Sequence, residues 1–473
     1  MIKNKLFTKL FSSGLQAISV QVLGGLFFYF ISIYLTKNDF GVIGWANAVS
    51  MFLTTLLGFG MEQVVVRRIA ASKRSDWAAA AFFLHSIVGF LMVFLLLLIL
   101  NKVIKTGTGI NKMLPWFFLA QGLIYIAVPL KQFLNAKEQF TPYGVIAVIS
   151  NLAKITIAWV LVEKSLLSVN TVLVILIITA GFELCCLLIY LLVKASFSFS
   201  FRFGAYIKLL KESSAQYLSV IFDSSLSRMD WILLGIMASG PALADYSFAY
   251  RAYELARLPL LIIAPVILPR FARLFSGNNL ISNEHKNNIN SFYQVEMFLA
   301  ASIPLLLNIL WMPLLTIITH GKYGQSNAME FLILSLCIPL QFFINLLWTL
   351  CFGAKLYKQV SYITVICAAT NVILNVVLIH WFNGEGAAIA FLATTLLQTA
   401  LYYRLTGKAV MRVNIWPIIL FTVEALAIYF AVTQLQLHFL LQLAIAAMAY
   451  AILIVASKQI KKEHLTNFRR LLT

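Results

Sequence analysis

The chain has 473 residues, of which 61% are hydrophobic and 11% are charged, and its mean hydropathy is +0.89. A soluble protein of this composition would expose large apolar patches to water, so the composition excludes a soluble globular fold and predicts an all-α polytopic membrane protein. The formal net charge is +19, but no basic soluble module accompanies it, which argues against nucleic acid as a partner.

A helix of about 20 apolar residues crosses the hydrocarbon core of a bilayer. By this criterion the chain contains about fourteen predicted spans. No small-residue cleavage site follows the first apolar run, so the run is predicted to be a span and not a signal peptide. In chain order the predicted spans are 12–35, 43–66, 78–100, 114–134, 142–162, 170–193, 213–237, 243–268, 293–318, 328–352, 360–382, 385–405, 414–433 and 438–457.

Lys and Arg residues are concentrated in alternate connections between these spans. They gather around Arg67 and Arg68, in the linker at 194–211 and at 404–412, whereas the intervening connections hold few of them. Because cytoplasmic loops carry the excess of basic residues, this bias places the N-terminus in the cytoplasm. An even number of spans then returns the C-terminus to the same side.

The span pattern also predicts an internal repeat. Six spans precede the basic, Phe- and Ser-rich linker at 194–211, and six more follow it. Both halves begin on the same side, which predicts a parallel repeat about an axis along the membrane normal, with a substrate path between the halves. The expected organisation is an N-terminal lobe at 1–198, a C-terminal lobe at 199–407 and two additional helices at 408–473.

Basic side chains inside predicted spans are the first candidates for a binding site. A charge at the bilayer centre costs about 2.5–3.5 kcal/mol on insertion scales, so such residues usually face a cavity or a partner. Tyr250 lies on a polar stripe of its span and offers a sugar both an apolar face and a hydroxyl. The basic candidates are Lys154, Arg228, Arg251 and Arg257.

Acidic side chains inside spans are candidates for ion coupling, because burial favours the neutral form of a carboxyl group. Asp223 and Asp230 share one polar face of the seventh predicted span, Glu254 lies in the eighth and Glu62 in the second. The alternative is purely structural, since Glu254 is three residues from both Arg251 and Arg257, and the aspartates can pair with neighbouring arginines. Both interpretations stay open from the sequence.

Cysteine and histidine usage predicts no metal site and no cofactor. The five cysteines fall within apolar runs without metal-ligand spacing, and the histidines near the predicted outer face are isolated from cysteines and carboxylates. These cysteines are therefore expected to be small core residues and not a disulfide framework.

Three stretches carry a family resemblance. The segment Leu35–Ala71 contains Asp39-Phe40-Gly41, Gly58-Phe59-Gly60 and Arg67-Arg68, and Asn371–Ala390 contains two asparagines four residues apart before a Gly-x-x-Gly-Ala-Ala turn. The third stretch comprises DSSLSRMDWILLG, YSFAYRAYELARL and Pro269-Arg270. Together they resemble the polysaccharide repeat-unit (O-antigen and capsule) flippases of the multidrug/oligosaccharidyl-lipid/polysaccharide exporter superfamily.

The resemblance implies translocation of an undecaprenyl-pyrophosphate-linked oligosaccharide from the cytoplasmic to the outer leaflet of a bacterial inner membrane by alternating access. Coupling to H⁺ or Na⁺, which the acids within the spans suggest, and a polysaccharide polymerase as partner are further expectations, and no enzymatic step is expected. Matched to the family pattern, Asp39 would help to latch an outer gate, although a helix N-cap is its simpler role. Arg67 and Arg68 would either anchor the cytoplasmic face or capture pyrophosphate first.

Two other transport functions and one enzymatic function remain as alternatives. A peptidoglycan lipid-precursor flippase is closely related in fold. An ion-coupled multidrug exporter of the same superfamily would typically have twelve spans and acidic residues for cationic drugs, whereas the site candidates here are cationic. A membrane glycosyltransferase or polymerase would need a paired-carboxylate loop or a phosphate-cradling Gly loop, and neither motif is present in the sequence.

Overall fold

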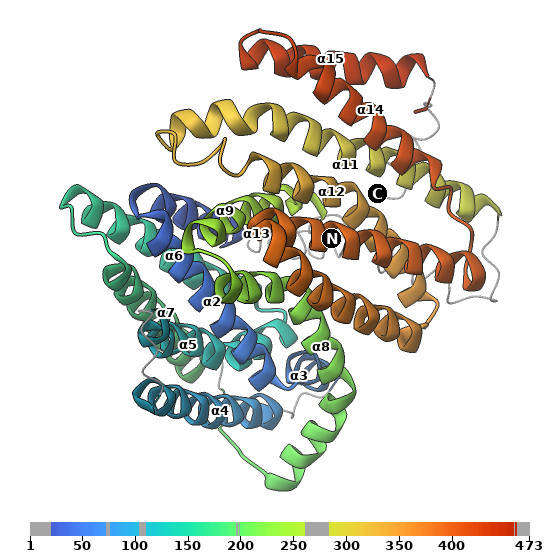
Figure 1. Ribbon diagram of the computed structural model, residues 1–473. Helices are drawn as coiled ribbons and strands as arrows, with labels where there is room; N and C mark the ends of the chain where they lie inside the picture. Colours follow the sequence, from blue (N-terminus) through green and yellow to red (C-terminus); the bar gives the residue numbers. More distant parts are fainter. Residues whose placement is uncertain are drawn as a thin grey trace. The chain divides into compact units, whose positions relative to one another are not determined.

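The computed structural model describes residues 20–71, 76–103, 110–194, 197, 199–260, 283–457, 459 and 460. Its secondary structure in this part of the chain is α-helical (Figure 1). The chain divides into two compact units, Met1–Ala244 and Asp245–Thr473. The predicted inner segment with Pro269 and Arg270 lies outside the described residues.

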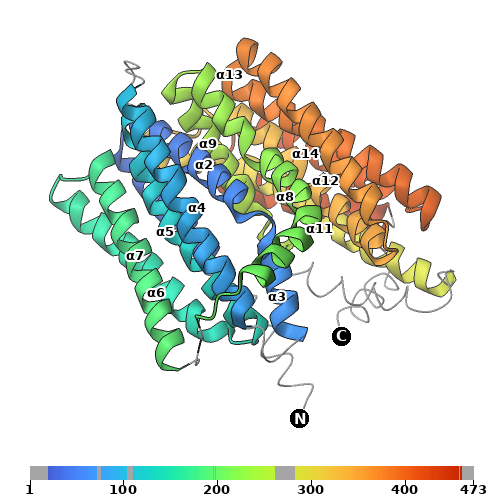
Figure 2. The same cartoon turned by 90° about the horizontal axis from the view of Figure 1, so that it is seen from below.

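The first unit contains a short apolar helix, Val20–Tyr34, followed by seven further helices. α2, α5 and α7 pack together, with α4 on α5, α6 on α7, and α8 along α2 and α3 (Figures 1 and 2). The helices are α2 (Lys37–Gly58), α3 (Met61–Ala71), α4 (Asp76–Val103), α5 (Ile110–Ala136), α6 (Phe140–Glu163), α7 (Val169–Val193) and α8 (Phe203–Met237).

The second unit is built around α11, which packs on α12, α14 and α15. α9 begins at the end of the first unit and continues into the second. The helices are α9 (Gly240–Ala256), α11 (Asn283–Ile318), α12 (Ala328–Gly353), α13 (Tyr357–Ala409), α14 (Trp416–Thr433) and α15 (Phe439–Ala456).

The backbone divides one predicted span and places a turn between two others. The predicted span 43–66 is broken into α2 and α3, because Phe59 and Gly60 take left-handed conformations with φ of 47° and 67°. The predicted spans 360–382 and 385–405 are the two helical arms of α13, and a turn at non-helical Asn383 (φ 49°, ψ −123°) separates them. At this turn a Cβ on Gly386 would lie 2.1 Å from the Leu378 carbonyl oxygen, so only glycine fits.

Ten helices in the described part of the chain are long and apolar enough to cross a membrane, and the protein is an all-helical membrane protein. α8 and α9 are not among the ten. α8 carries Asp223, Arg228 and Asp230 in place of apolar residues, which lowers its hydropathy. The count of about fourteen spans therefore stays a prediction.

The core of the first unit is formed where α3, α4, α5 and α7 meet. Small residues let these helices approach closely, as membrane helices need because lipid provides little hydrophobic force between them. The run Ala78–Ala81 of α4 is buried. Gly122 of α5 lies directly under Phe90, whose ring a Cβ would approach to 2.2 Å.

The compact units do not follow the predicted lobe boundary at 198/199. α8 packs against α2, α3 and α4 and so belongs to the first unit. Trp45 of α2 donates its indole N–H to the Ile232 carbonyl oxygen at 3.3 Å and covers Gly235. The division into two six-helix lobes and a C-terminal helix pair remains a prediction based on the repeat.

Candidate functional site

The charged residues predicted on the eighth span form two local pairs in and just after α9. Arg251 Nη1 donates to Glu254 Oε2 at 2.7 Å, and both side chains are mostly buried. Arg257 Nη1 donates to the Tyr253 hydroxyl at 2.6 Å, and its guanidinium lies 4.9 Å from the centroid of that ring. One arginine is thus neutralised by a carboxylate, whereas the other is held by an aromatic ring.

Arg257 has hydrogen-bonding capacity left over. Its Nε is buried and has no acceptor in the described part of the chain, where no carboxylate lies within ion-pair distance of its guanidinium either. A buried, unsatisfied charged donor is costly unless a ligand or water supplies an acceptor. Arg257 is therefore the intramembrane arginine best suited to an anionic ligand.

Tyrosines surround this arginine. Tyr250 and Tyr253 are 4% and 0% exposed, and both meet Phe391 of α13 edge-on, with ring centroids 5.6 and 5.5 Å apart. Tyr246 packs one turn earlier against Tyr250. The predicted sugar contact, Tyr250, thus has most of its ring buried against protein.

The second group of predicted residues lies on α8 in the first unit. Asp230 is fully buried, and its Oδ1 accepts the Trp231 backbone N–H at 2.8 Å. The Arg228 guanidinium lies 5.8 Å from the centroid of the Trp231 ring. The carbonyl of Asp223 accepts the Ser227 hydroxyl at 3.0 Å, and the Asp223 side chain is exposed. The candidate residues of the seventh predicted span therefore lie in the first unit, and those of the eighth predicted span lie in the second.

Lys154 lies in a polar layer inside the first unit. Its Nζ is 3.4 Å from Asn151 Oδ1 on the same helix. On the neighbouring helices Lys131 of α5 and Glu183 of α7 form an ion pair of 2.5 Å, and Glu183 also attracts Lys154 electrostatically. Spacing along the chain did not indicate that Lys154 and Lys131 share the Glu183 carboxylate.

The remaining gating candidates take ordinary structural partners. Glu62 of α3 accepts a hydrogen bond from Gln132 Nε2 at 3.0 Å. Thr36, not Asp39, is the N-cap of α2: its hydroxyl accepts the Asp39 N–H at 3.1 Å and donates to Asp39 Oδ2 at 2.7 Å. The expectation that Asp39 is the N-cap was therefore wrong by three residues. Asp39 lies in the first turn of α2, where its negative charge interacts favourably with the helix dipole.

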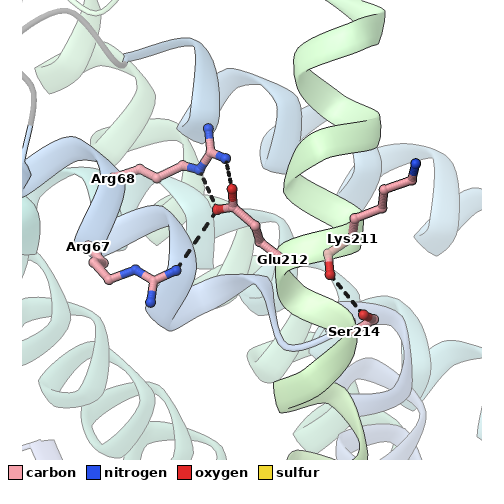
Figure 3. Close-up of polar contacts among 5 residues, drawn as sticks. All are labelled: Arg67, Arg68, Lys211, Glu212 and Ser214. Atoms are coloured by element: carbon pink, nitrogen blue, oxygen red, sulfur yellow. Dashed lines mark hydrogen bonds and ion pairs between the residues drawn. The ribbon is translucent and has the colours of Figure 1, made fainter.

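A cluster that the sequence did not predict joins α3 to α8 (Figure 3). Glu212 of α8 accepts two hydrogen bonds from Arg68, from Nε at 2.9 Å and from Nη2, and Arg67 Nη2 lies 3.9 Å from the same carboxylate. Arg68 also lies over the Trp77 ring, 5.2 Å from its centroid. The hydrogen bond from Arg68 lowers the pKa of Glu212 below its usual 4.5. The available signal was a lone acid, directly after Lys211, at the end of a basic segment.

A second unexpected contact joins α4 to α8 and to the end of α2. His85 of α4 bridges the Tyr206 hydroxyl, 2.7 Å from Nδ1, and the Leu57 carbonyl oxygen, 2.8 Å from Nε2. That carbonyl belongs to the last turn of α2, where the break at Phe59 and Gly60 interrupts the helical hydrogen bonds. The histidine therefore satisfies a helix end that the break leaves open.

No group of three or more His, Cys, Asp or Glu side chains in the described residues has metal-binding geometry. Cys337, Cys351 and Cys367 are buried and unpaired thiols. The chemistry that these groups offer is binding of an anion and of polar ligands.

Comparisons with known proteins agree with this architecture. Over residues 5–275 the chain matches the family model described as "Polysaccharide biosynthesis protein". No curated protein matches the chain in sequence. Among solved structures, "Lipid II flippase MurJ, inward closed conformation" has a TM-score of 0.76 and 14% identity, covering 94% of this chain and 100% of that one.

Two exporter structures show the same fold at lower similarity. An inward-facing multidrug resistance MATE family transporter of the MOP superfamily has a TM-score of 0.62 and 12% identity, covering 90% of this chain and 96% of that one. A MOP superfamily transporter from Pyrococcus furiosus, for which the reverse polarity of the binding pocket suggests a different function, has a TM-score of 0.59 and 12% identity, covering 84% of this chain and 95% of that one. The proteins that share this fold are flippases and transporters, not enzymes. Since the family model spans more than half of its residues, this chain belongs to the polysaccharide biosynthesis protein family.

Proposed function

We propose that the protein is a flippase that moves undecaprenyl-pyrophosphate-linked oligosaccharide repeat units from the cytoplasmic to the outer leaflet of a bacterial inner membrane, for the synthesis of cell-surface polysaccharide. Its family membership and flippase fold support transport of a polysaccharide precursor. The observation that favours an anionic substrate most strongly is Arg257, whose buried Nε lacks an acceptor among the described residues. A pyrophosphate supplies several oxygens for such a donor.

Transfer of a sugar and a pyrophosphate across hydrocarbon requires polar groups within the helices of the protein. Sugars and phosphates lose their hydrogen bonds in hydrocarbon, so a protein must offer replacements during transfer. In this proposal Arg228, Arg251, Arg257 and Lys154 supply positive charge and Tyr250 borders the sugar path. Transport by alternating access requires no covalent step, and both termini stay in the cytoplasm.

Ion coupling is part of the same proposal. Asp223 and Glu62 are accessible acidic side chains within the helical part of the chain, and Asp230 and Glu254 are buried or partly buried. In this scheme their protonation or Na⁺ binding drives the transition between inward- and outward-open forms, with Asp39 at the outer gate. A polysaccharide polymerase would accept the translocated unit.

A peptidoglycan-precursor flippase is the second candidate. The observation in its favour is the similarity in fold to the lipid II flippase MurJ. Both cargos share a lipid pyrophosphate, so Arg257 is compatible with either. An ion-coupled multidrug exporter is the third candidate, and a cationic drug would meet charge repulsion at the same arginine.

The experiment is a leaflet-transfer assay in proteoliposomes that contain a lipid-pyrophosphate oligosaccharide. Transfer by the parent protein and its loss in Arg257→Ala would support the proposal. Lys358→Ala is the matched control, because Lys358 is an exposed basic residue at the start of α13. Transfer of lipid II in preference to oligosaccharide lipids would favour the second candidate, and export of cationic dyes without lipid transfer would favour the third.

A further inference from the structure

The arginine pair at the end of α3, Arg67 and Arg68, has the form of an anion site. Two adjacent guanidinium groups converge on one carboxylate, that of Glu212, and Figure 3 shows both side chains directed toward it. Forked, charge-assisted hydrogen bonds of this kind are what arginine offers to phosphate as well as to carboxylate. The occupant in this structure is a side chain of the protein itself.

The exposed fractions of these side chains are compatible with replacement of the Glu212 carboxylate by another anion. The Arg68 side chain is 18% exposed and is supported by Trp77, whereas Arg67 is 66% exposed and Glu212 is 33% exposed. One guanidinium is therefore fixed in position while the carboxylate remains accessible to solvent. A pyrophosphate diester carries more negative charge and more acceptor oxygens than a single carboxylate, so it can satisfy both arginines at once.

A left-handed turn and close packing lie at the other end of α3. α3 is joined to α2 by the left-handed turn at Phe59 and Gly60. At this turn Phe59 stacks on Tyr217 with ring centroids 4.2 Å apart, and a Cβ on Gly60 would lie 3.0 Å from the Tyr217 backbone nitrogen. α3 thus contacts α8 at its first turn through close packing and at its last turn through the arginine pair.

We propose that Arg67 and Arg68 form a binding site for the pyrophosphate group of a lipid-linked substrate, and that Glu212 occupies this site until the substrate displaces it and frees α3 from α8. The site lies in a segment predicted to face the cytoplasm, where such a substrate would first arrive. The identity of the cargo rests on the proposed function, but the anion site and its release of α3 do not.

Binding is measured on the purified full-length protein in detergent by titration calorimetry with inorganic pyrophosphate. Glu212→Gln removes the competing charge and is expected to tighten binding about fivefold, because the site is no longer held closed. Arg68→Ala is expected to weaken binding by at least about tenfold. Lys211→Gln, the matched control, removes a positive charge whose side chain points away from Glu212 (Figure 3) and is expected to stay within about twofold.

A distance measurement separates displacement from a general effect of charge. Spin labels are attached through Ala71→Cys on α3 and Ser214→Cys on α8, both exposed positions. Cys185→Ser and Cys186→Ser remove the two native thiols that are not buried. Saturating pyrophosphate is expected to add a longer distance between the labels, and Glu212→Gln is expected to show that distance without ligand. This measurement remains informative if Arg68→Ala does not fold.

The outcomes that would overturn the proposal are equally specific. Unchanged pyrophosphate affinity in Glu212→Gln, or unchanged label distances at saturation, would refute displacement. Undecaprenyl pyrophosphate in nanodiscs should bind at least as tightly as inorganic pyrophosphate, and binding of the inorganic anion alone would refute substrate capture. Displacement without leaflet transfer in proteoliposomes would retain this site while removing the proposed function.

Discussion

The ion pair between Lys131 and Glu183 gives a quantitative test of how the first unit holds its charges. The pair is 2.5 Å long, and its side chains are 23% and 10% exposed. Glu183 also attracts Lys154, whose ammonium group donates a hydrogen bond to Asn151. Glu183→Gln would therefore leave two buried ammonium groups facing one neutral amide.

The magnitude follows from the position of the pair. Two unit charges 4 Å apart attract by about 4 kcal/mol at an effective dielectric constant near 20. Breaking one partner of a buried pair typically costs about 3–5 kcal/mol, because the other charge stays buried without compensation. The amide of glutamine can still accept one hydrogen bond, so we expect Glu183→Gln to lower the free energy of unfolding by about 2–3 kcal/mol.

The assay is equilibrium unfolding of purified protein in mixed micelles of a mild detergent and SDS. The double variant Glu183→Gln with Lys131→Met removes one of the stranded ammonium groups and should recover more than half of the loss. A change below about 0.5 kcal/mol in the single variant would refute the reasoning and would indicate that water screens the pair.

Three further predictions concern separate contacts. Gly235→Ala should lower the free energy of unfolding by about 1–3 kcal/mol, measured in the same assay, because its Cβ would lie 2.0 Å from Trp45 Cδ1. Tyr450→Phe should cost about 0.5–1 kcal/mol, because it deletes the hydrogen bond to the Phe298 carbonyl oxygen and keeps the stacked ring. Finally, the stabilisation from Glu212 should be complete above pH 4.5 and should disappear as pH falls through its lowered pKa. Melting curves of Glu212→Gln should lack this pH dependence, and the difference should stay below about 1 kcal/mol because the pair is partly exposed.

The sequence was sufficient to predict the fold class, because hydropathy and span length are properties of single segments. It did not predict the break at the end of α2, because Gly58-Phe59-Gly60 was recognised only as a family motif. The left-handed turn there depends on the close approach of Tyr217, more than 150 residues later in the chain. A contact of this kind is not visible in local periodicity.

The contacts of the candidate site were predictable only where both partners lie on one helix. Arg251 and Glu254 pair three residues apart on one helix, which spacing alone suggested. The acids that attract Lys154 and Arg68 lie on other helices, at Glu183 and Glu212, and a single sequence gives no register between helices. Arg257 and Tyr253 show the intermediate case, since the spacing was visible but the choice of tyrosine over Glu254 as hydrogen-bond partner depends on side-chain rotamers.

The two ends of the contact between α2–α3 and α8 differ in a way that bears on transport. Near Trp45 the helices meet through glycine and a single indole hydrogen bond, and at Glu212 they meet through charges that a soluble or lipid-borne anion can replace. Close packing at glycine depends on shape and responds to no ligand, whereas an ion pair can be exchanged for another. If substrate binding opens this contact, it must therefore begin at the Arg68–Glu212 end, and variants at Gly235 should change stability without changing the affinity for pyrophosphate.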